Sequence, residues 1–317
     1  YLPDTGSKRV LTTGGHFSYL KIAEGCDKHC TYCIIPKLRG KFRSVPMERL
    51  IAQAEDMAEQ GVKELILVAQ ETTVYGKDLY GKKSLHILLK KLCEIRGIRW
   101  IRILYCYPEE IYDELIESIR DEKKICHYLD IPIQHASDRI LKRMGRRTSK
   151  QELIDIVGKL RKEIPDIVLR TTLITGFPGE TEEDHEELKE FVDEMEFDRL
   201  GVFTYSPEEN TPAAEMADQV PEEVKEERRD ELMELQQEIS YDRGQDRIGQ
   251  ELLVMIEGKV ADESAYIGRT YGDAPKVDGY IFVQTGELLM TGDFAKVRVT
   301  GALEYDLIGV LSDEYTE

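Results

Sequence analysis

The chain has 317 residues, of which 41% are hydrophobic, and its formal net charge is −19. This length exceeds one ordinary core and indicates a large domain followed by a smaller one. No stretch reaches 18 consecutive apolar residues and no signal peptide is visible, so we expect a cytoplasmic protein without a membrane partner. The acidic surface argues against a broad non-specific grip on nucleic acid and suits a basic partner.

From about residue 16 to 206 the pattern alternates between strands and helices. Strands are predicted at 17–24, 63–70, 100–106, 128–134, 167–175 and 199–206. Helices are predicted between them, at 46–61, 84–95, 109–120 and in a segment that Thr181 can cap. Six β/α units in sequence predict about six parallel strands with helices outside, either as an open doubly wound sheet or as a partial or full (β/α) barrel.

The last third of the chain follows a different pattern. A charge-rich helix with a thin apolar stripe is predicted at 221–245. From residue 248 the period changes to two, and five short strands bounded by glycines and acidic turns predict a small antiparallel β-barrel. We therefore divide the chain into a (β/α) domain with its connecting helix, residues 1–246, and a barrel domain, residues 247–317.

Three of the six cysteines, Cys26, Cys30 and Cys33, follow the first strand with the spacing C-x3-C-x2-C. Their clustering indicates a metal or cofactor site rather than a disulfide framework. A structural zinc ion needs a fourth ligand, and His29 is directly beside Cys30, where joint ligation is strained. Three thiolates on a four-iron cube leave one iron open to a small molecule that carries an amine and a carboxylate.

Several sequence stretches carry a family resemblance. The stretch EGCDKHCTYCIIP (24–36) resembles the radical S-adenosylmethionine superfamily, and its methylthiotransferases have stretches similar to VAQETTVYG (68–76), PIQHASDRILKRMGRR (132–147) and GFPGET (176–181). FTYSPEENT (203–211) and GRTYGDAPKVDG (268–279) resemble the branch that methylthiolates the β-carbon of an aspartate in a small-subunit ribosomal protein. The resemblance implies one four-iron, four-sulfur (4Fe-4S) cluster on the three cysteines, S-adenosylmethionine as cofactor, and hydrogen abstraction by a deoxyadenosyl radical.

The resemblance also places cofactor-binding residues near the cysteines. Tyr32, just before the last cysteine, corresponds to an aromatic position beside the adenine. Glu71 ends the second predicted strand, where the superfamily often has Gly-Gly-Glu binding the methionine amine; here Ala69 and Gln70 replace the two glycines. A carboxylate at this position can accept hydrogen bonds from an ammonium group.

Further candidates lie after the fourth and fifth predicted strands. Gln134, His135 and Ser137 follow the fourth strand, where ribose hydroxyls need polar partners. Arg170 lies inside the fifth strand among apolar residues; because an unpaired buried charge is costly, we expect it to point into the barrel, to meet a carboxylate and to bind the cofactor. Gly176 permits close backbone approach. The sequence identifies no general acid or base.

The choice of substrate rests on the closing barrel, which the resemblance identifies as a TRAM domain, often an RNA binder. Residues 248–317 contain five Lys or Arg and thirteen Asp or Glu, a net charge of −8. An RNA-binding barrel should be basic, so this charge favours a basic ribosomal protein, free or on the ribosome, that the barrel guides to the mouth of the sheet. The alternatives are methylthiolation of adenosine in transfer RNA, and a non-catalytic, zinc-containing ribosome- or RNA-binding module.

The chain begins at Tyr1 rather than Met, so we expect a piece of a longer protein. Family members carry an upstream domain with three further cysteines and a second 4Fe-4S cluster implicated in sulfur delivery. The chain by itself is expected to bind one cluster and to cleave S-adenosylmethionine with an external electron donor, without completing sulfur insertion. Cys93, Cys106 and Cys126 are predicted to be small buried hydrophobes.

Overall fold

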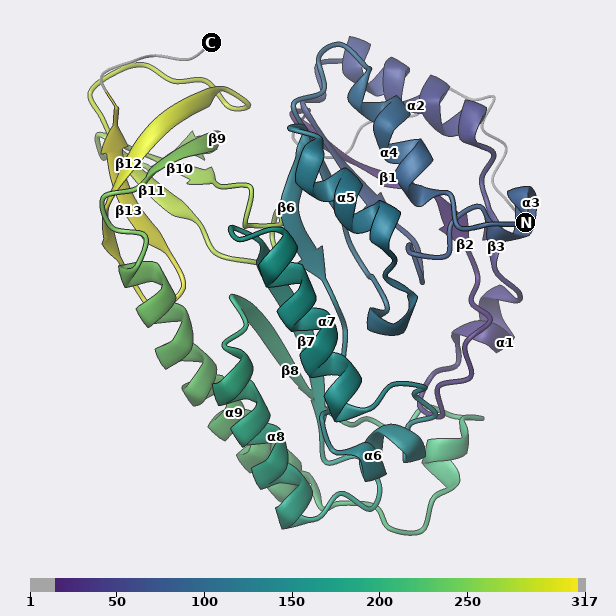
Figure 1. The fold of residues 1–317 in the computed structure, drawn as a ribbon. Coiled ribbons are helices and arrows are strands. Elements are labelled where there is room, and N and C mark those ends of the chain that lie inside the picture. The colour runs from purple at the N-terminus through teal and green to yellow at the C-terminus, as the bar shows by residue number, and fades with distance from the viewer. Residues whose placement is uncertain (1–14, 313–317) are drawn as a thin grey trace.

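A six-stranded parallel sheet forms the centre of the larger domain in the computed structural model, which describes residues 15–312 (Figure 1). Its neighbouring strands follow the order of the chain, and every pair is parallel. The strands are β1 (Phe17–Lys21), β4 (Glu64–Val68), β5 (Trp100–Ile103), β6 (Ile125–Asp130), β7 (Val168–Thr175) and β8 (Arg199–Thr204). Because β1 and β8 do not pair in the described residues, the predicted (β/α) barrel is a partial one.

Amphipathic helices cover the outer face of this sheet. They are α2 (Met47–Glu59), α4 (Leu85–Cys93), α5 (Asp113–Asp121), α7 (Lys150–Glu163) and α8 (Glu182–Met195). Their leucines and isoleucines pack with the apolar strand residues into the main core, which includes Leu50, Leu88, Ile101, Leu169 and Leu188. Thr181 caps α8 as predicted, because its side chain and that of Asp184 satisfy each other's backbone N–H groups. No helix of the described part is long and apolar enough to span a bilayer.

Short elements complete the carboxyl edge of the sheet. They are β2 (Ala23–Glu24), α1 (Ile35–Arg39), β3 (Arg43–Ser44), α3 (Lys77–Tyr80), α6 (Asp138–Arg143) and 3-10 turns at Pro108–Glu110 and Pro212–Glu215. The strand predicted at 128–134 is displaced, since β6 covers Ile125–Asp130. Pro132 cannot donate to a ladder, and Gln134 has a φ of 72° with a single bridge to Leu173, so the apolar run leaves the sheet after Asp130.

Helix α9 (Glu222–Gln245) leads to the second domain, a closed five-stranded barrel. Its strands are β9 (Glu251–Lys259), β10 (Ala265–Arg269), β11 (Ile281–Gln284), β12 (Phe294–Ala302) and β13 (Leu307–Leu311). The predicted small barrel is confirmed, with one difference from a fully antiparallel arrangement. The loop after β11 crosses the barrel, so that β13 returns beside β11 in parallel.

The barrel docks on the amino-terminal ends of the parallel strands, as the arrangement in Figure 1 shows. Glu64 lies between Arg102 (2.8 Å) and Arg269 of the barrel (2.7 Å), and all three side chains are fully buried. The first residues of four parallel strands contact the barrel: Glu64 of β4, Trp100 of β5, Val168 of β7 and Arg199 of β8. Since the cysteines follow the opposite ends of the strands, a substrate held by the acidic barrel would have to extend past the sheet to reach them.

Candidate functional site

The loop with the three cysteines lies at the carboxyl edge of the sheet and is fixed at both ends. The Cys26 N–H donates to Gly40 O (3.1 Å), and a Cβ on Gly25 would lie 2.3 Å from Lys41 O, so only glycine fits there. Farther along, the Thr31 N–H donates to Met144 O (2.9 Å). The sequence stretch 132–147 is thereby held against the cysteine loop.

The thiols occupy a largely dry environment. Cys26 and Cys30 are buried and Cys33 is half-buried. Burial raises the pKa of Cys26 to about 11 and also raises that of Cys33, so cluster assembly must release protons here. In the described part of the chain no three His, Cys, Asp or Glu side chains surround a single ion position. A 4Fe-4S cluster does not require three side chains around one ion position, because each thiolate binds a different iron.

Glu71 lies just after β4, as predicted. One of its carboxylate oxygens accepts hydrogen bonds within the protein, and the other has no hydrogen-bond partner. Its Oε1 accepts hydrogen bonds from Thr73 N (3.0 Å) and from Tyr107 N (3.5 Å). Its Oε2 is buried and has no partner. Burial raises the pKa of this carboxyl to about 7, against the opposing effect of Thr73 and Lys28. An ammonium group at Oε2 would supply the missing donor.

Arg146 and Tyr107 also belong to this site, although the sequence did not single out either for it. The Tyr107 hydroxyl lies 3.5 Å from Cys30 Sγ, and the Arg146 guanidinium lies 4.2 Å from the Tyr107 ring centroid. Arg146 is 6% exposed; its Nη2 donates to Pro132 O (3.1 Å) and lies 3.8 Å from Glu109 Oε2, whereas its Nε and Nη1 have no hydrogen-bond partner. Its place in the stretch 132–147, which carries the family resemblance, was the available signal.

These unpartnered atoms form a complementary pair around Tyr107. A buried carboxylate oxygen on Glu71 needs a donor, and two buried guanidinium nitrogens on Arg146 need an acceptor. Leaving such groups unpaired is costly, so the arrangement suits a ligand with both an ammonium and a carboxylate. The donor set of three thiolates beside this pair therefore fits a cluster together with the amino-acid part of S-adenosylmethionine.

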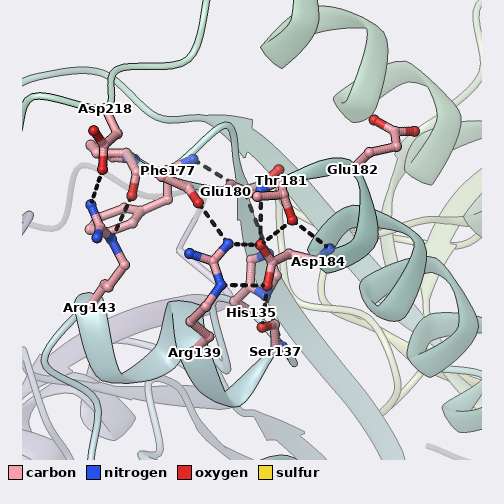
Figure 2. Close-up of polar contacts among 12 residues, drawn as sticks. His135, Ser137, Arg139, Arg143, Phe177, Glu180, Thr181, Glu182, Asp184 and Asp218 are labelled. Carbon is pink, nitrogen blue, oxygen red and sulfur yellow. Dashed lines mark hydrogen bonds and ion pairs between the residues drawn. The ribbon is translucent and has the colours of Figure 1, made fainter.

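His135 and Ser137 take part in a network of polar contacts within the protein (Figure 2). The fully buried His135 ring accepts at Nδ1 from the Ala136 and Ser137 N–H groups (3.0 Å each), and its Nε2 lies 3.5 Å from Glu180 Oε2. The Ser137 hydroxyl donates to Asp184 Oδ1 (2.7 Å). These contacts join α6 to the start of α8, and a ribose-binding role for either residue stays a prediction.

The other predicted positions also lie at this edge. Gln134 is buried beside β7, and the Tyr32 ring meets Phe177 edge to face at 6.4 Å. At Gly176 (φ +68°) a Cβ would lie 2.1 Å from Lys225 Cγ, so this glycine lets α9 pack closely. Their cofactor contacts stay predictions.

Arg170 meets carboxylates, as expected. Its Nη1 donates to Asp130 Oδ1 (2.8 Å), and its Nε lies 3.3 Å from Asp278 Oδ1 of the barrel domain. The predicted ion pairing is confirmed, whereas a role in binding the cofactor stays a prediction.

Comparison with known proteins agrees with this geometry. The model of the Radical SAM superfamily matches residues 20–192, and that of the TRAM domain matches residues 248–311. A protein of Lachnoclostridium phytofermentans named "Ribosomal protein uS12 methylthiotransferase RimO" is 68% identical over 98% of this chain and 70% of its own length. The chain belongs to the RimO family. A RimO of Clostridium perfringens is 55% identical over 96% of the chain and 68% of its own length.

Solved structures share the fold of this RimO-family chain at low identity. Coproporphyrinogen III oxidase (HemN) from Escherichia coli has a TM-score of 0.56 and 18% identity, with 89% of this chain and 66% of that chain covered. The methyltransferase TsrM from Kitasatospora setae has a TM-score of 0.53 and 15% identity, with 62% and 38% covered. Membership of a radical S-adenosylmethionine enzyme family favours the radical enzyme over the zinc-containing binding module.

Proposed function

We propose that this chain carries the radical chemistry of a methylthiotransferase that modifies the β-carbon of an aspartate in ribosomal protein uS12. The proposal rests on one observation. The Glu71 oxygen and the Arg146 nitrogens that have no hydrogen-bond partners flank Tyr107, whose hydroxyl contacts Cys30. The names of the relatives and the net charge of −8 on residues 248–317 support a protein substrate over transfer RNA.

Each residue of the site has a distinct task in this proposal. Cys26, Cys30 and Cys33 hold the cluster, Glu71 accepts from the ammonium group, and Arg146 donates to the carboxylate. Tyr32 lies beside the adenine, while the ribose partners are drawn from Gln134, His135 and Ser137. Bound there, the reduced cluster and S-adenosylmethionine supply the carbon radical that abstracts hydrogen from the substrate.

The surroundings of the cysteines keep this chemistry away from water. Tyr107 is 7% exposed and Glu71 is 1% exposed, so two of the side chains beside the cysteines are shielded from solvent. Low local polarity strengthens the ionic contacts of Glu71 and Arg146 with a bound amino acid. The Tyr107 backbone N–H also orients the Glu71 carboxylate.

The remaining parts of the reaction call for groups beyond this site. We propose that a second 4Fe-4S cluster and the sulfur supply lie in a region upstream of residues 1–317, since the relatives are longer than the chain. Cys93, Cys106 and Cys126 lie outside the cysteine loop; Cys106 and Cys126 are buried, as predicted, and Cys93 is half-buried. An external protein supplies the electron, and uS12 is met in the cytoplasm, free or on the ribosome.

The test begins with anaerobic reconstitution of the chain with iron and sulfide. We expect about four irons per chain and formation of 5′-deoxyadenosine from S-adenosylmethionine with a reductant. The variant Cys33→Ala should lose both. With the upstream region restored, uS12 and a transfer RNA anticodon stem-loop are offered side by side. Modification of one uS12 aspartate supports the proposal; modification of the RNA alone, or zinc in place of iron, would overturn it.

A further inference from the structure

One face of the partial barrel carries polar and aromatic side chains instead of core residues. In β7, Leu169 and Leu173 pack into the core under the helices, so the alternating Arg170, Thr172 and Ile174 face the inside of the sheet. In the neighbouring β8, Leu200 and Val202 belong to that core, which turns Arg199, Gly201 and Phe203 to the inside. We call this inner face the lumen.

In the lumen, Arg170 forms contacts through Nη1 and Nε, and its third guanidinium nitrogen, Nη2, has no described partner. Asp130 (2.8 Å) and Thr172 Oγ1 (3.2 Å) accept from its Nη1, and Asp278 lies 3.3 Å from its Nε. No described residue accepts from Nη2, which lies 3.7 Å from where a Cβ on Gly201 would be. Because Gly201 has no side chain, the space beside Nη2 stays open, while the other two guanidinium nitrogens of Arg170 are held in place.

This edge lies close to the cysteine site. The second Asp130 oxygen accepts from the Tyr105 N–H (3.1 Å). Tyr105 is two residues before Tyr107, whose hydroxyl lies 3.5 Å from Cys30 Sγ, so this segment joins the lumen to the cysteine site. Tyr105 is 42% exposed, and Phe203 is 60% exposed although it lies within a strand. Exposed aromatic side chains beside a fixed arginine are typical of a binding site.

We propose that Arg170 donates from Nη2 to the side-chain carboxylate of the substrate aspartate, with Phe203 and Tyr105 flanking the substrate peptide. This assignment rests on the proposed function and replaces the predicted cofactor role of Arg170. In aspartate the β-carbon is bonded to the carboxylate carbon. A guanidinium that holds the carboxylate therefore fixes the C–H bond to be broken, one bond away.

The charges around Arg170 are compatible with an additional anion. Asp130 and Asp278 face it, and Arg199 pairs with Asp273 (2.6 Å) in the neighbouring strand. Asp278 Oδ2 also accepts from the Tyr128 hydroxyl (2.8 Å) and from the Ala274 N–H (2.9 Å), so Arg170 is not its only partner. A neutral adenine base offers ring nitrogens as acceptors but no negative charge, so its contact with Nη2 would be weaker.

The test measures binding of uS12 and of uS12 with its target Asp→Asn to the reconstituted chain with S-adenosylmethionine. The unaltered chain should prefer the aspartate form about tenfold or more, as for a charged hydrogen bond. Arg170→Gln should abolish this preference, and Arg170→Lys should retain part of it. Substrate-free formation of 5′-deoxyadenosine is measured in both variants as a separate report on the cofactor site.

Arg199→Gln is the matched control, because Arg199 is the register partner of Arg170 and also pairs with the barrel loop. It should keep the preference. An unchanged preference in Arg170→Gln would overturn the proposal, as would loss of substrate-free cleavage in both Arg170 variants, which would return Arg170 to the cofactor. If the unaltered chain bound neither form of uS12, the proposed function would fail, and this assignment with it.

Discussion

The hydroxyl oxygen of Tyr107 lies 3.5 Å from Sγ of Cys30. The same tyrosine donates its backbone N–H to Glu71 (3.5 Å), and its ring supports the Arg146 guanidinium at 4.2 Å and the Lys28 ammonium at 5.0 Å. One residue therefore links a cluster-binding thiol to both groups proposed to hold the cofactor. Hydrogen bonds to the sulfur ligands of iron–sulfur clusters are among the factors that set their reduction potentials.

Tyr107→Phe should lower the reduction potential of the reconstituted cluster. The substitution removes a donor to the Cys30 thiolate but keeps the ring under Arg146 and the backbone contact with Glu71. Less stabilisation of the more negative, reduced state makes reduction harder. A potentiometric titration followed by electron paramagnetic resonance measures the effect. Tyr75→Phe is the control, since its buried hydroxyl donates to Val45 O (2.8 Å) and touches no cysteine. Equal potentials in all three proteins would contradict the prediction.

Glu71 should make the cofactor-free protein less stable as pH rises from about 4.5 to 7. Its pKa rises from 4.5 unfolded to about 7 folded because of burial, so between these values the folded state binds more protons than the unfolded state. The loss amounts to about 3 kcal/mol and is complete above pH 7. Urea unfolding across this range should show a flatter dependence in Glu71→Gln.

Binding of S-adenosylmethionine should show the opposite trend. An ammonium ligand needs the ionised Glu71 carboxylate, so affinity should increase as pH rises through 7, and Glu71→Gln should lose this dependence together with most of the affinity. Unaltered pH dependence in the variant would mean that another group accepts from the ammonium.

The parallel domain and the cysteine site could be predicted because their signals are local. Apolar runs that alternate with helical patterns define the strands, and C-x3-C-x2-C together with Glu71 follows strand ends that meet at one edge. Arg146 and Tyr107 could not be placed in the same way. Their relation to Cys30 depends on how the loops after three different strands fold over one another, and no spacing in the sequence encodes that approach.

The contacts of Arg170 could also be predicted only in part from the sequence. The cost of a buried charge predicted a carboxylate partner, and Asp130 from the adjacent strand provides one. The second partner, Asp278, comes from the barrel domain, and its approach depends on the docking of the two domains. His135 shows that a polar side chain after a strand can instead accept hydrogen bonds from the neighbouring backbone.

Arg146→Met should abolish most cofactor binding without destabilising the cofactor-free protein. Two of its three guanidinium nitrogens are buried without hydrogen-bond partners, so removing this charge relieves a desolvation cost that offsets the loss of its 3.8 Å ion pair with Glu109, and a methionine fills similar space. Affinity for S-adenosylmethionine should fall about tenfold or more, measured by equilibrium dialysis. Arg143→Met, in the same segment but paired with Asp218 (3.4 Å) at the surface, should bind normally. Normal binding by Arg146→Met would remove Arg146 from the site.

Glu64→Gln should destabilise the protein by about 3–5 kcal/mol, because it leaves the buried charges of Arg102 and Arg269 without their shared carboxylate. Burial by itself would raise the pKa of Glu64, but the two arginines outweigh it and lower the pKa. The stabilisation is therefore present above the unfolded pKa near 4.5 and lost as pH falls through the lower folded value, so the difference between variant and unaltered protein should shrink in acid.

Urea unfolding at several pH values measures this difference, and limited proteolysis of the Gln variant should cut the connection between α9 and β9 faster as the barrel loosens. Arg229→Gln removes a surface pair with Asp230 and should leave both measurements unchanged. Since the barrel also supplies Asp278 to Arg170, Glu64→Gln should weaken the preference for the aspartate form of uS12 while leaving S-adenosylmethionine binding intact. A variant as stable as the unaltered chain would show that the buried triad does not hold the two domains together.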